Sequence, residues 1–90
     1  MVRFAYGKNH GRIVLDLKEF NQQDMVIKKE MIRYTISRVL GNKQGIGSVH
    51  IEEILSLCEK GIGNKYTMPN RNIKVEILHH KIIFQDTKMS

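Results

Sequence analysis

The stretch Asp24–Gly41, DMVIKKEMIRYTISRVLG, decides the fold class of this 90-residue sequence. Its apolar residues recur at helical spacing, joined by Thr35: Met25, Met31, Ile32, Ile36 and Val39. Asn21 or Asp24 can cap the first turn by accepting hydrogen bonds from free backbone N–H groups. Gly41 follows the last periodic residue, where a left-handed backbone costs least without a Cβ. The pattern predicts an amphipathic helix over residues 24–40.

The segments on either side of this helix show different patterns. Residues 12–19 alternate between apolar and polar side chains, which predicts a half-buried strand. After a loop over residues 42–47, Ser48 is the expected N-cap of a second helix that ends at Gly61. One face of this second helix, over residues 48–60, carries Ile51, Ile54, Leu55 and Cys58.

The last third of the chain contains short β patterns separated by turn residues. Residues 66–69 lead into the turn-forming Asn70–Asn72, residues 73–77 alternate, and residues 82–84 follow a break at His79–Lys81. The order β-α-α-β-β-β predicts an α+β domain over residues 12–85, in which two helices pack on one face of a small, largely antiparallel sheet. We expect residues 1–11 to be irregular and residues 86–90 to form a tail.

Composition narrows the class of protein. The chain is 41% hydrophobic and 27% charged, close to globular averages, which argues against a disordered or collagenous chain. It contains no apolar run of the length that a signal peptide or a membrane span needs. Cys58 is the single cysteine and has no disulfide partner within the chain. These features predict a cytoplasmic domain with no membrane partner.

Positive charge is concentrated in the first half of the sequence. Residues 1–45 hold nine basic and four acidic side chains, whereas residues 46–90 hold six and five. Within the first helix, Lys29 and Arg33 lie one turn apart and can present adjacent cations, while Arg38 lies elsewhere around the helix. Lys28 falls beside the apolar stripe, where its stem can pack on the core edge or its ammonium group can contact a phosphate.

The sequence offers no convincing catalytic or metal-binding motif. Neither glycine-rich loop matches the Walker pattern, and the histidines lack the spacing of a zinc site. We expect His50 to pack or hydrogen-bond locally. Cys58 lies on an apolar face, where its thiol should be neutral and inert. Glu52 and Glu53 are consecutive helical residues that diverge by about 100° and so cannot share a site.

Several segments resemble a known family. They are Met31–Ile36 (MIRYTI), His50–Leu57 (HIEEILSL) and Gly63–Asn70 (GNKYTMPN), followed by the strands around residues 73–75 and 82–84. Over residues 13–84 the chain resembles the domain that follows the catalytic domain in bacterial tRNA(Ile)-lysidine synthases of the PP-loop ATPase superfamily. Arg71 replaces the usual turn glycine, and His79-His80 replaces a common aromatic and acidic pair.

The resemblance implies a non-catalytic domain that binds and positions tRNA. The parent enzyme would use ATP to join lysine to the wobble cytidine of an isoleucine tRNA. The pyrophosphate-binding Ser-Gly-Gly-x-Asp-Ser loop is absent from this sequence, so catalysis, ATP and Mg²⁺ are expected only in the catalytic domain, which would be a partner of this one. The residues expected to contact tRNA are Lys28, Lys29, Arg33, Arg38, Lys65 and Arg71.

Two other functions stay open at this point. Two helices followed by a hairpin are also typical of a winged-helix DNA-binding module, although Glu52, Glu53 and Glu59 would repel a major groove. A protein-interaction or spacer domain would account for the nearly neutral second half of the chain. The oligomeric state also stays open, and a homodimer is one alternative.

Overall fold

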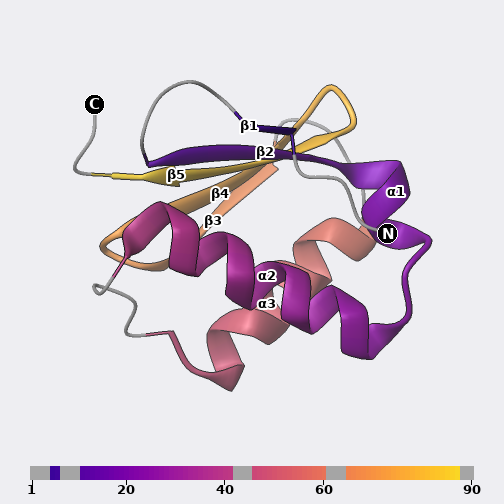
Figure 1. Ribbon diagram of the computed structural model, residues 1–90, viewed down its shortest axis with the longest axis horizontal. Coiled ribbons are helices and arrows are strands. Elements are labelled where there is room, and N and C mark those ends of the chain that lie inside the picture. The colour runs from indigo at the N-terminus through magenta and orange to yellow at the C-terminus, as the bar shows by residue number, and fades with distance from the viewer. Residues whose placement is uncertain (1–4, 7–10, 42–45, 61–64, 88–90) are drawn as a thin grey trace.

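The computed structural model describes residues 5–6, 11–41, 46–60 and 65–87, with backbone alone for the first pair. It is an α+β domain in which two helices pack on one face of an antiparallel sheet (Figure 1). In chain order the elements are β1 (Ala5–Tyr6), β2 (Arg12–Asp16), α1 (Leu17–Asn21), α2 (Met25–Leu40), α3 (Ser48–Lys60), β3 (Lys65–Asn70), β4 (Ile73–Leu78) and β5 (Lys81–Asp86). The predicted fold class and element order are confirmed, with β1 and α1 as additions.

Some predicted features lie outside the described residues. These are most of the irregular segment 1–11, residues 42–45 of the loop over 42–47, the helix end at Gly61 and residues 88–90 of the tail over 86–90. The expected start of the tail is wrong, because Asp86 is the last residue of β5. Ala5–Tyr6, inside the segment expected to be irregular, form β1 and pair with β2.

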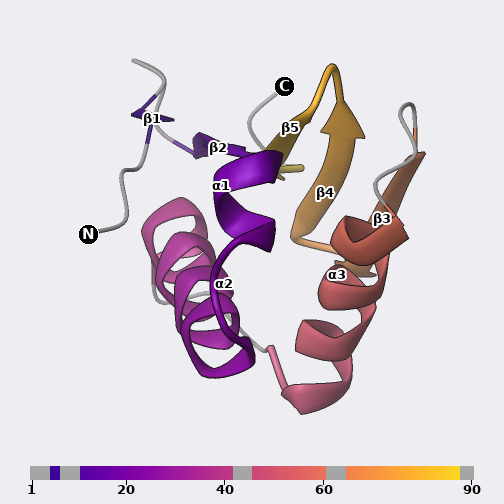
Figure 2. The same cartoon turned by 90° about the vertical axis from the view of Figure 1, so that its right-hand side faces the viewer.

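The sheet has the order β1-β2-β5-β4-β3, and each neighbouring pair is antiparallel. Figures 1 and 2 show α2 and α3 side by side on the same face of the twisted sheet, with α1 at one end. Strand β5 lies at the centre because it pairs with β2 on one side and β4 on the other. The strand latest in the chain therefore holds the two halves of the sheet together.

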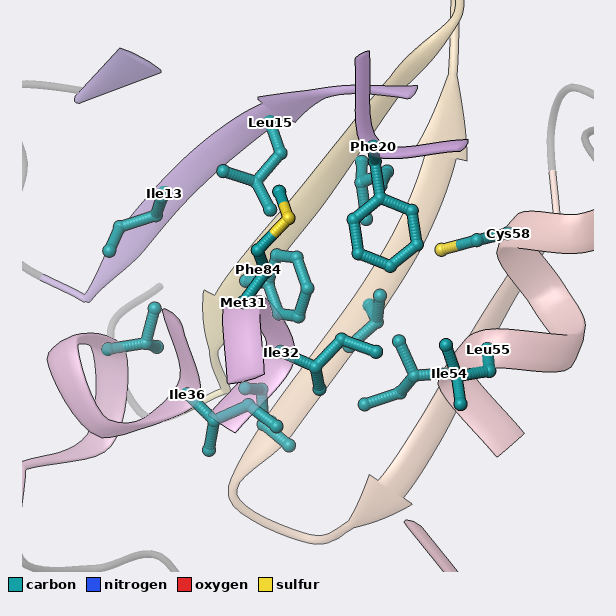
Figure 3. Packing of buried hydrophobic residues seen from close by; sticks show 14 of the residues in the cluster. Ile13, Leu15, Phe20, Met31, Ile32, Ile36, Ile54, Leu55, Cys58 and Phe84 are labelled. Atoms are coloured by element: carbon teal, nitrogen blue, oxygen red, sulfur yellow. The ribbon is translucent and has the colours of Figure 1, made fainter. Parts of the chain in front are cut away.

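The core lies between this face and the helices. In β2 and β4, alternate residues are buried, as expected where one face of a sheet is covered. Each helix contributes one apolar stripe, as Figure 3 shows for Ile32 and Ile36 of α2 and Ile54 and Leu55 of α3. Phe20 and Phe84 are the largest fully buried side chains of the described residues.

The predicted strand over residues 12–19 is wrong beyond Asp16. Asp16 Oδ1 accepts a hydrogen bond from Glu19 N at 2.9 Å and so caps α1. Leu17 and Phe20 then lie one helical turn apart and are both buried. Leu17 fits both the alternating pattern of the strand and the apolar face of the short helix. The alternation of residues 13–17 therefore does not show where the strand ends and the helix begins.

Helix α2 begins and ends close to the predicted bounds. Asp24 is its N-cap, with Oδ1 accepting from Ile27 N at 3.0 Å, and Gly41 follows the last turn with a φ of 63°. Asn21, the other candidate cap, instead donates from Nδ2 to the Cys58 carbonyl at 3.3 Å. Met25 was expected in the core but is 52% exposed, because the first turn of α2 lies beyond the packed layer.

The N-cap of α3 is Gly47 rather than the predicted Ser48. The Gly47 carbonyl accepts the helical hydrogen bond of Ile51 N at 3.2 Å, and Gly47 N donates to His50 Nδ1 at 2.9 Å. His50 thus takes the role that Glu or Gln has in a capping box. Its expected local role is confirmed.

The two hairpins of the second half differ in their turns. At the β3–β4 turn, Asn70 Oδ1 accepts from Asn72 N at 2.7 Å, a local bond typical of turns that contain asparagine. Pro69 lies within the edge strand β3, where the register shifts between Thr67 and Asn70. The β4–β5 turn consists of His79 and His80, with φ values of 51° and 62°. Both are in the left-handed region required by a type I′ turn.

Replacing His79 by Asn and His80 by Gly should stabilise the domain. Asn and Gly tolerate the left-handed backbone that these two histidines now adopt, so we expect an increase of about 1 kcal/mol in the free energy of unfolding. Urea denaturation followed by circular dichroism measures it. The His80→Ala variant keeps a Cβ at the second position and should show no comparable gain. Equal or lower stability of the double variant would contradict this account of the turn.

Candidate nucleic-acid interface

Two of the predicted cations, Lys29 and Arg33, lie on one side of α2. They are separated by one helical turn, and Arg33 is exposed. Lys29 faces α3, where its Nζ lies 3.8 Å from Glu52 Oε1; the two side chains are 41% and 66% exposed. Exposed ion pairs contribute about 0.2–1 kcal/mol, so this one adds little to stability. It does reduce the positive potential that Lys29 presents to an anionic ligand.

The other two cations of α2 lie near aromatic rings. Lys28 Nζ is 5.8 Å from the centroid of the Phe20 ring, and Arg38 Cζ is 6.0 Å from that of Tyr34. Lys28 is half-buried, which agrees with a stem packed along the core edge, whereas Arg38 is exposed. The four cations of α2 therefore do not form a single row.

Lys65 and Arg71 are separated by the length of β3. Lys65 is the first residue of the strand, Arg71 lies in the turn after it, and both are exposed. Six residues of strand span about 20 Å. The turn with Arg71 lies at the same end of the molecule as the C-terminal end of α2, which carries Arg38 (Figure 1). The six predicted contact residues thus fall into separate groups.

The two helices carry opposite charge. The acidic residues Glu52, Glu53 and Glu59 of α3 are all exposed. Lys60 is the only lysine or arginine in this helix. Helix α2 contains four cations and a single acidic residue, Glu30. A phosphate backbone would be attracted to α2 and repelled by α3. Within the helical layer, α2 is therefore the side that favours an anionic ligand.

The sheet has an open face, which points away from α2 and α3. Strand alternation and register place on it Arg12, Val14 and Asp16 of β2, Lys81, Ile83 and Gln85 of β5, Lys74, Glu76 and Leu78 of β4, and Tyr66 of β3. Arg12 pairs with Gln85, and Gln85 with Lys74, so one row across three strands ends in two cations. Lys74 Nζ lies 4.7 Å from the centroid of the Tyr66 ring.

The sequence interpretation missed Arg12, Lys74 and Tyr66 as site residues. Alternation alone assigns Arg12 and Lys74 to the polar sides of their strands. It does not say that β5 lies between these strands, nor which residues face each other across it. That register depends on the hairpin of β4 and β5 and on the pairing of β5 with β2, which lies about seventy residues away in the chain.

The Cys58 thiol is buried, in agreement with its predicted inertness. Burial raises the pKa of the Cys58 thiol to about 12, while the positive charge of Lys28 lowers it in part.

Within the described ranges, no three His, Cys, Asp or Glu side chains are placed to share a metal ion. No helix among those residues is both long and apolar enough to cross a bilayer.

Comparison with known proteins does not assign this chain to a family. No protein-family model matches it, and neither the curated proteins nor the solved structures contain a significant match.

The Cys58 thiol should resist labelling in the native protein. Because its folded pKa is about 12, the reactive thiolate is scarce at pH 7–9, and reaction with a disulfide reagent should require unfolding. The unfolded thiol ionises near its ordinary pKa of 9.0, so Cys58 should lower stability as pH rises from about 9 towards 12. Labelling rates with and without denaturant measure the first effect. Rapid stoichiometric labelling of the native chain would contradict the buried placement.

Proposed function

We propose that this chain is a non-catalytic domain that binds and positions tRNA within a tRNA(Ile)-lysidine synthase-like enzyme. The observation that carries the proposal is the exposed basic side of α2, where Arg33 follows Lys29 by one turn. Contacts of such side chains to phosphates fix the register of a nucleic acid without reading its bases. Chemistry on the wobble cytidine then belongs to the catalytic domain.

The observed order of elements supports the proposal. The resemblance implies a strand, two helices and closing strands, and the described residues follow that order with β1 and α1 added. Its two most specific segments also have local structural roles. His50 caps α3 at the start of the His-Ile-Glu segment, and Asn70 forms the hydrogen bond that turns the chain after Pro69.

The same proposal assigns cofactors, a protein partner and a location. ATP and Mg²⁺ would act in the catalytic domain, since this sequence lacks the phosphate-binding loop. That catalytic domain would be the direct protein partner of this one. A cytoplasmic location follows because bacterial tRNA is modified in the cytoplasm, and an unpaired, buried Cys58 suits a reducing compartment.

One observation favours a protein-interaction function as a second candidate. Met25, Val26 and Ile27 are consecutive and exposed at the start of α2. Such apolar side chains fit contact with another domain, and this contact is compatible with tRNA binding. The winged-helix alternative fits less well, because α3, its candidate recognition helix, exposes three glutamates.

Removing the cations of α2 should reduce the salt dependence of tRNA binding. We expect Lys29→Gln with Arg33→Gln to flatten the slope of log K against log[salt] by about 1–2, from a weak affinity near 10⁻⁴–10⁻⁶ M. Arg33→Gln alone should account for about 0.7–0.9, and Lys29→Gln for less because Glu52 already balances that charge. Filter binding across a salt series measures both quantities.

Glu52→Gln is the matched control for this series. It removes the carboxylate opposite Lys29 and should strengthen tRNA binding while leaving the fold unchanged. If slope and affinity do not respond to any of these variants, the basic side of α2 is merely solvated and the protein-interaction function takes precedence.

The purified chain should not consume ATP. It lacks a phosphate-cradling loop and an acid/base pair, so it should not release pyrophosphate when mixed with ATP, lysine and tRNA. A pyrophosphate assay tests this directly. Lysine-dependent release above the level of a buffer blank would contradict the assignment of catalysis to another domain.

A further inference from the structure

We propose that the open face of the sheet is a second RNA site, which binds unpaired nucleotides with Tyr66 as the stacking residue and Arg12 and Lys74 as phosphate contacts. The inference rests on the proposed function only in taking RNA as the ligand. It places binding on the side of the sheet opposite the basic side of α2.

The open face carries side chains that a ligand can reach, among them the exposed Arg12 and Tyr66. Both long helices lie on the other side of the sheet (Figures 1 and 2). Tyr66 is 60% exposed although it lies in a strand. A large aromatic ring that packs against little of its own protein is available to stack on a base, and each such stack strengthens binding irrespective of base identity.

Two of the cations on the open face share one row. Arg12 and Lys74 flank Gln85 across β2, β5 and β4, and no acidic side chain belongs to this row. The two cations are separated by two strand spacings, about 10 Å. This separation lets one short oligonucleotide contact both. Asp16 lies at the opposite end of β2, and Glu76 lies in the next row, where it pairs with Tyr66. The carboxylate of Glu76 therefore offsets part of the positive charge beside the ring.

Tyr66 and Lys74 form a unit that suits a nucleotide. The ammonium group lies 4.7 Å from the ring centroid, within the range of a cation–π contact. A base can stack on the other face of the exposed ring, and this ammonium group is then available to a phosphate of the same strand. Lys74 therefore holds the ring in place and balances the charge of the ligand.

The centre of the face is apolar and already packed by neighbouring side chains. Val14 and Ile83 are directly paired, and Ile83 is 8% exposed although it is not part of the core beneath the helices. The Ile83 side chain is therefore mostly covered by neighbouring side chains, whereas the nearby Tyr66 ring is exposed. The cations of the row favour an anionic RNA strand over a second copy of the chain, because each copy carries a formal net charge of +6.

The geometry favours unpaired RNA over a duplex. A-form RNA has a deep, narrow major groove that a sheet face cannot enter, whereas splayed bases stack on aromatic residues of open sheets. A fluorescent oligouridine therefore serves as the probe. Its anisotropy on titration with the chain gives the affinity, and an unlabelled RNA duplex should compete only weakly.

Substitution of Tyr66 tests the stacking role. Tyr66→Ala should weaken oligouridine binding by about 5- to 150-fold, the range of base–aromatic stacking. Tyr66→Phe and Tyr66→Trp retain a ring and should bind within about twofold of the parent chain, because stacking does not require the hydroxyl group. Since the chain has no tryptophan, the Trp variant also provides a single indole whose fluorescence should be quenched by the RNA.

Tyr34→Ala is the matched control, because Tyr34 is an exposed tyrosine on the helical side. It should leave oligouridine binding unchanged, whereas Arg12→Gln or Lys74→Gln should each lower the salt slope by about 0.7. Unchanged affinity of Tyr66→Ala would overturn the site on the sheet. If tRNA binding still responds to Arg33→Gln, the proposed function survives that result.

Self-association is the remaining outcome for this face. If sedimentation shows a dimer of the parent chain that Tyr66→Ala dissociates, and oligouridine does not bind, then a second copy occupies the face and the RNA inference is overturned.

Discussion

The fold depends on the burial of one face of β5. Phe84 lies between Ile13 and Val75 in the sheet, and Ile82 lies between Leu15 and Ile77. These rows form the surface on which the apolar stripes of α2 and α3 pack. Truncating a buried phenylalanine costs about 3–5 kcal/mol, which is a large part of the total stability of a domain of this size. Without β5 the two halves of the sheet would not be joined, and the surface beneath α2 and α3 would be divided.

Because the helices cover one face of the sheet, the outer side of the helical layer and the open face of the sheet carry different side chains. The helical layer divides its charge, with cations on α2 and glutamates on α3, and one ion pair connects the two. The open face instead combines a cationic row with an exposed ring. The domain therefore has two distinct surfaces, one with charge alone and one that combines charge with an exposed aromatic ring.

The fold class could be predicted from the sequence because the spacing of apolar residues changes from the helical period in some segments to strand alternation in others. Residues 25–40 and 73–77 each follow one period over their whole length, and both assignments are confirmed. Asp16 marks where this reasoning failed, because a capping side chain can end a strand while the apolar pattern continues. Met25 shows another limit, since periodicity identifies the face of a helix but not where the sheet beneath it ends.

Only part of the candidate site was accessible to the same reasoning. Helical spacing predicted that Lys29 and Arg33 share a side of α2, because both belong to one element. The carboxylate opposite Lys29 comes from α3, and the Arg12–Lys74 row requires the register of three strands. Such relations arise from tertiary packing, which local pattern does not encode.

The shape of strand β3 affects how the protein behaves at high concentration. An exposed edge strand offers free N–H and C=O groups to other chains and can start intermolecular sheet growth. Pro69 removes one of the donors of β3, and the irregular pairing between Thr67 and Asn70 interrupts its regular ladder. At the other edge of the sheet, β1 is only two residues long. Neither edge is a good template, so the sheet is protected against edge-to-edge polymerisation without a covering helix.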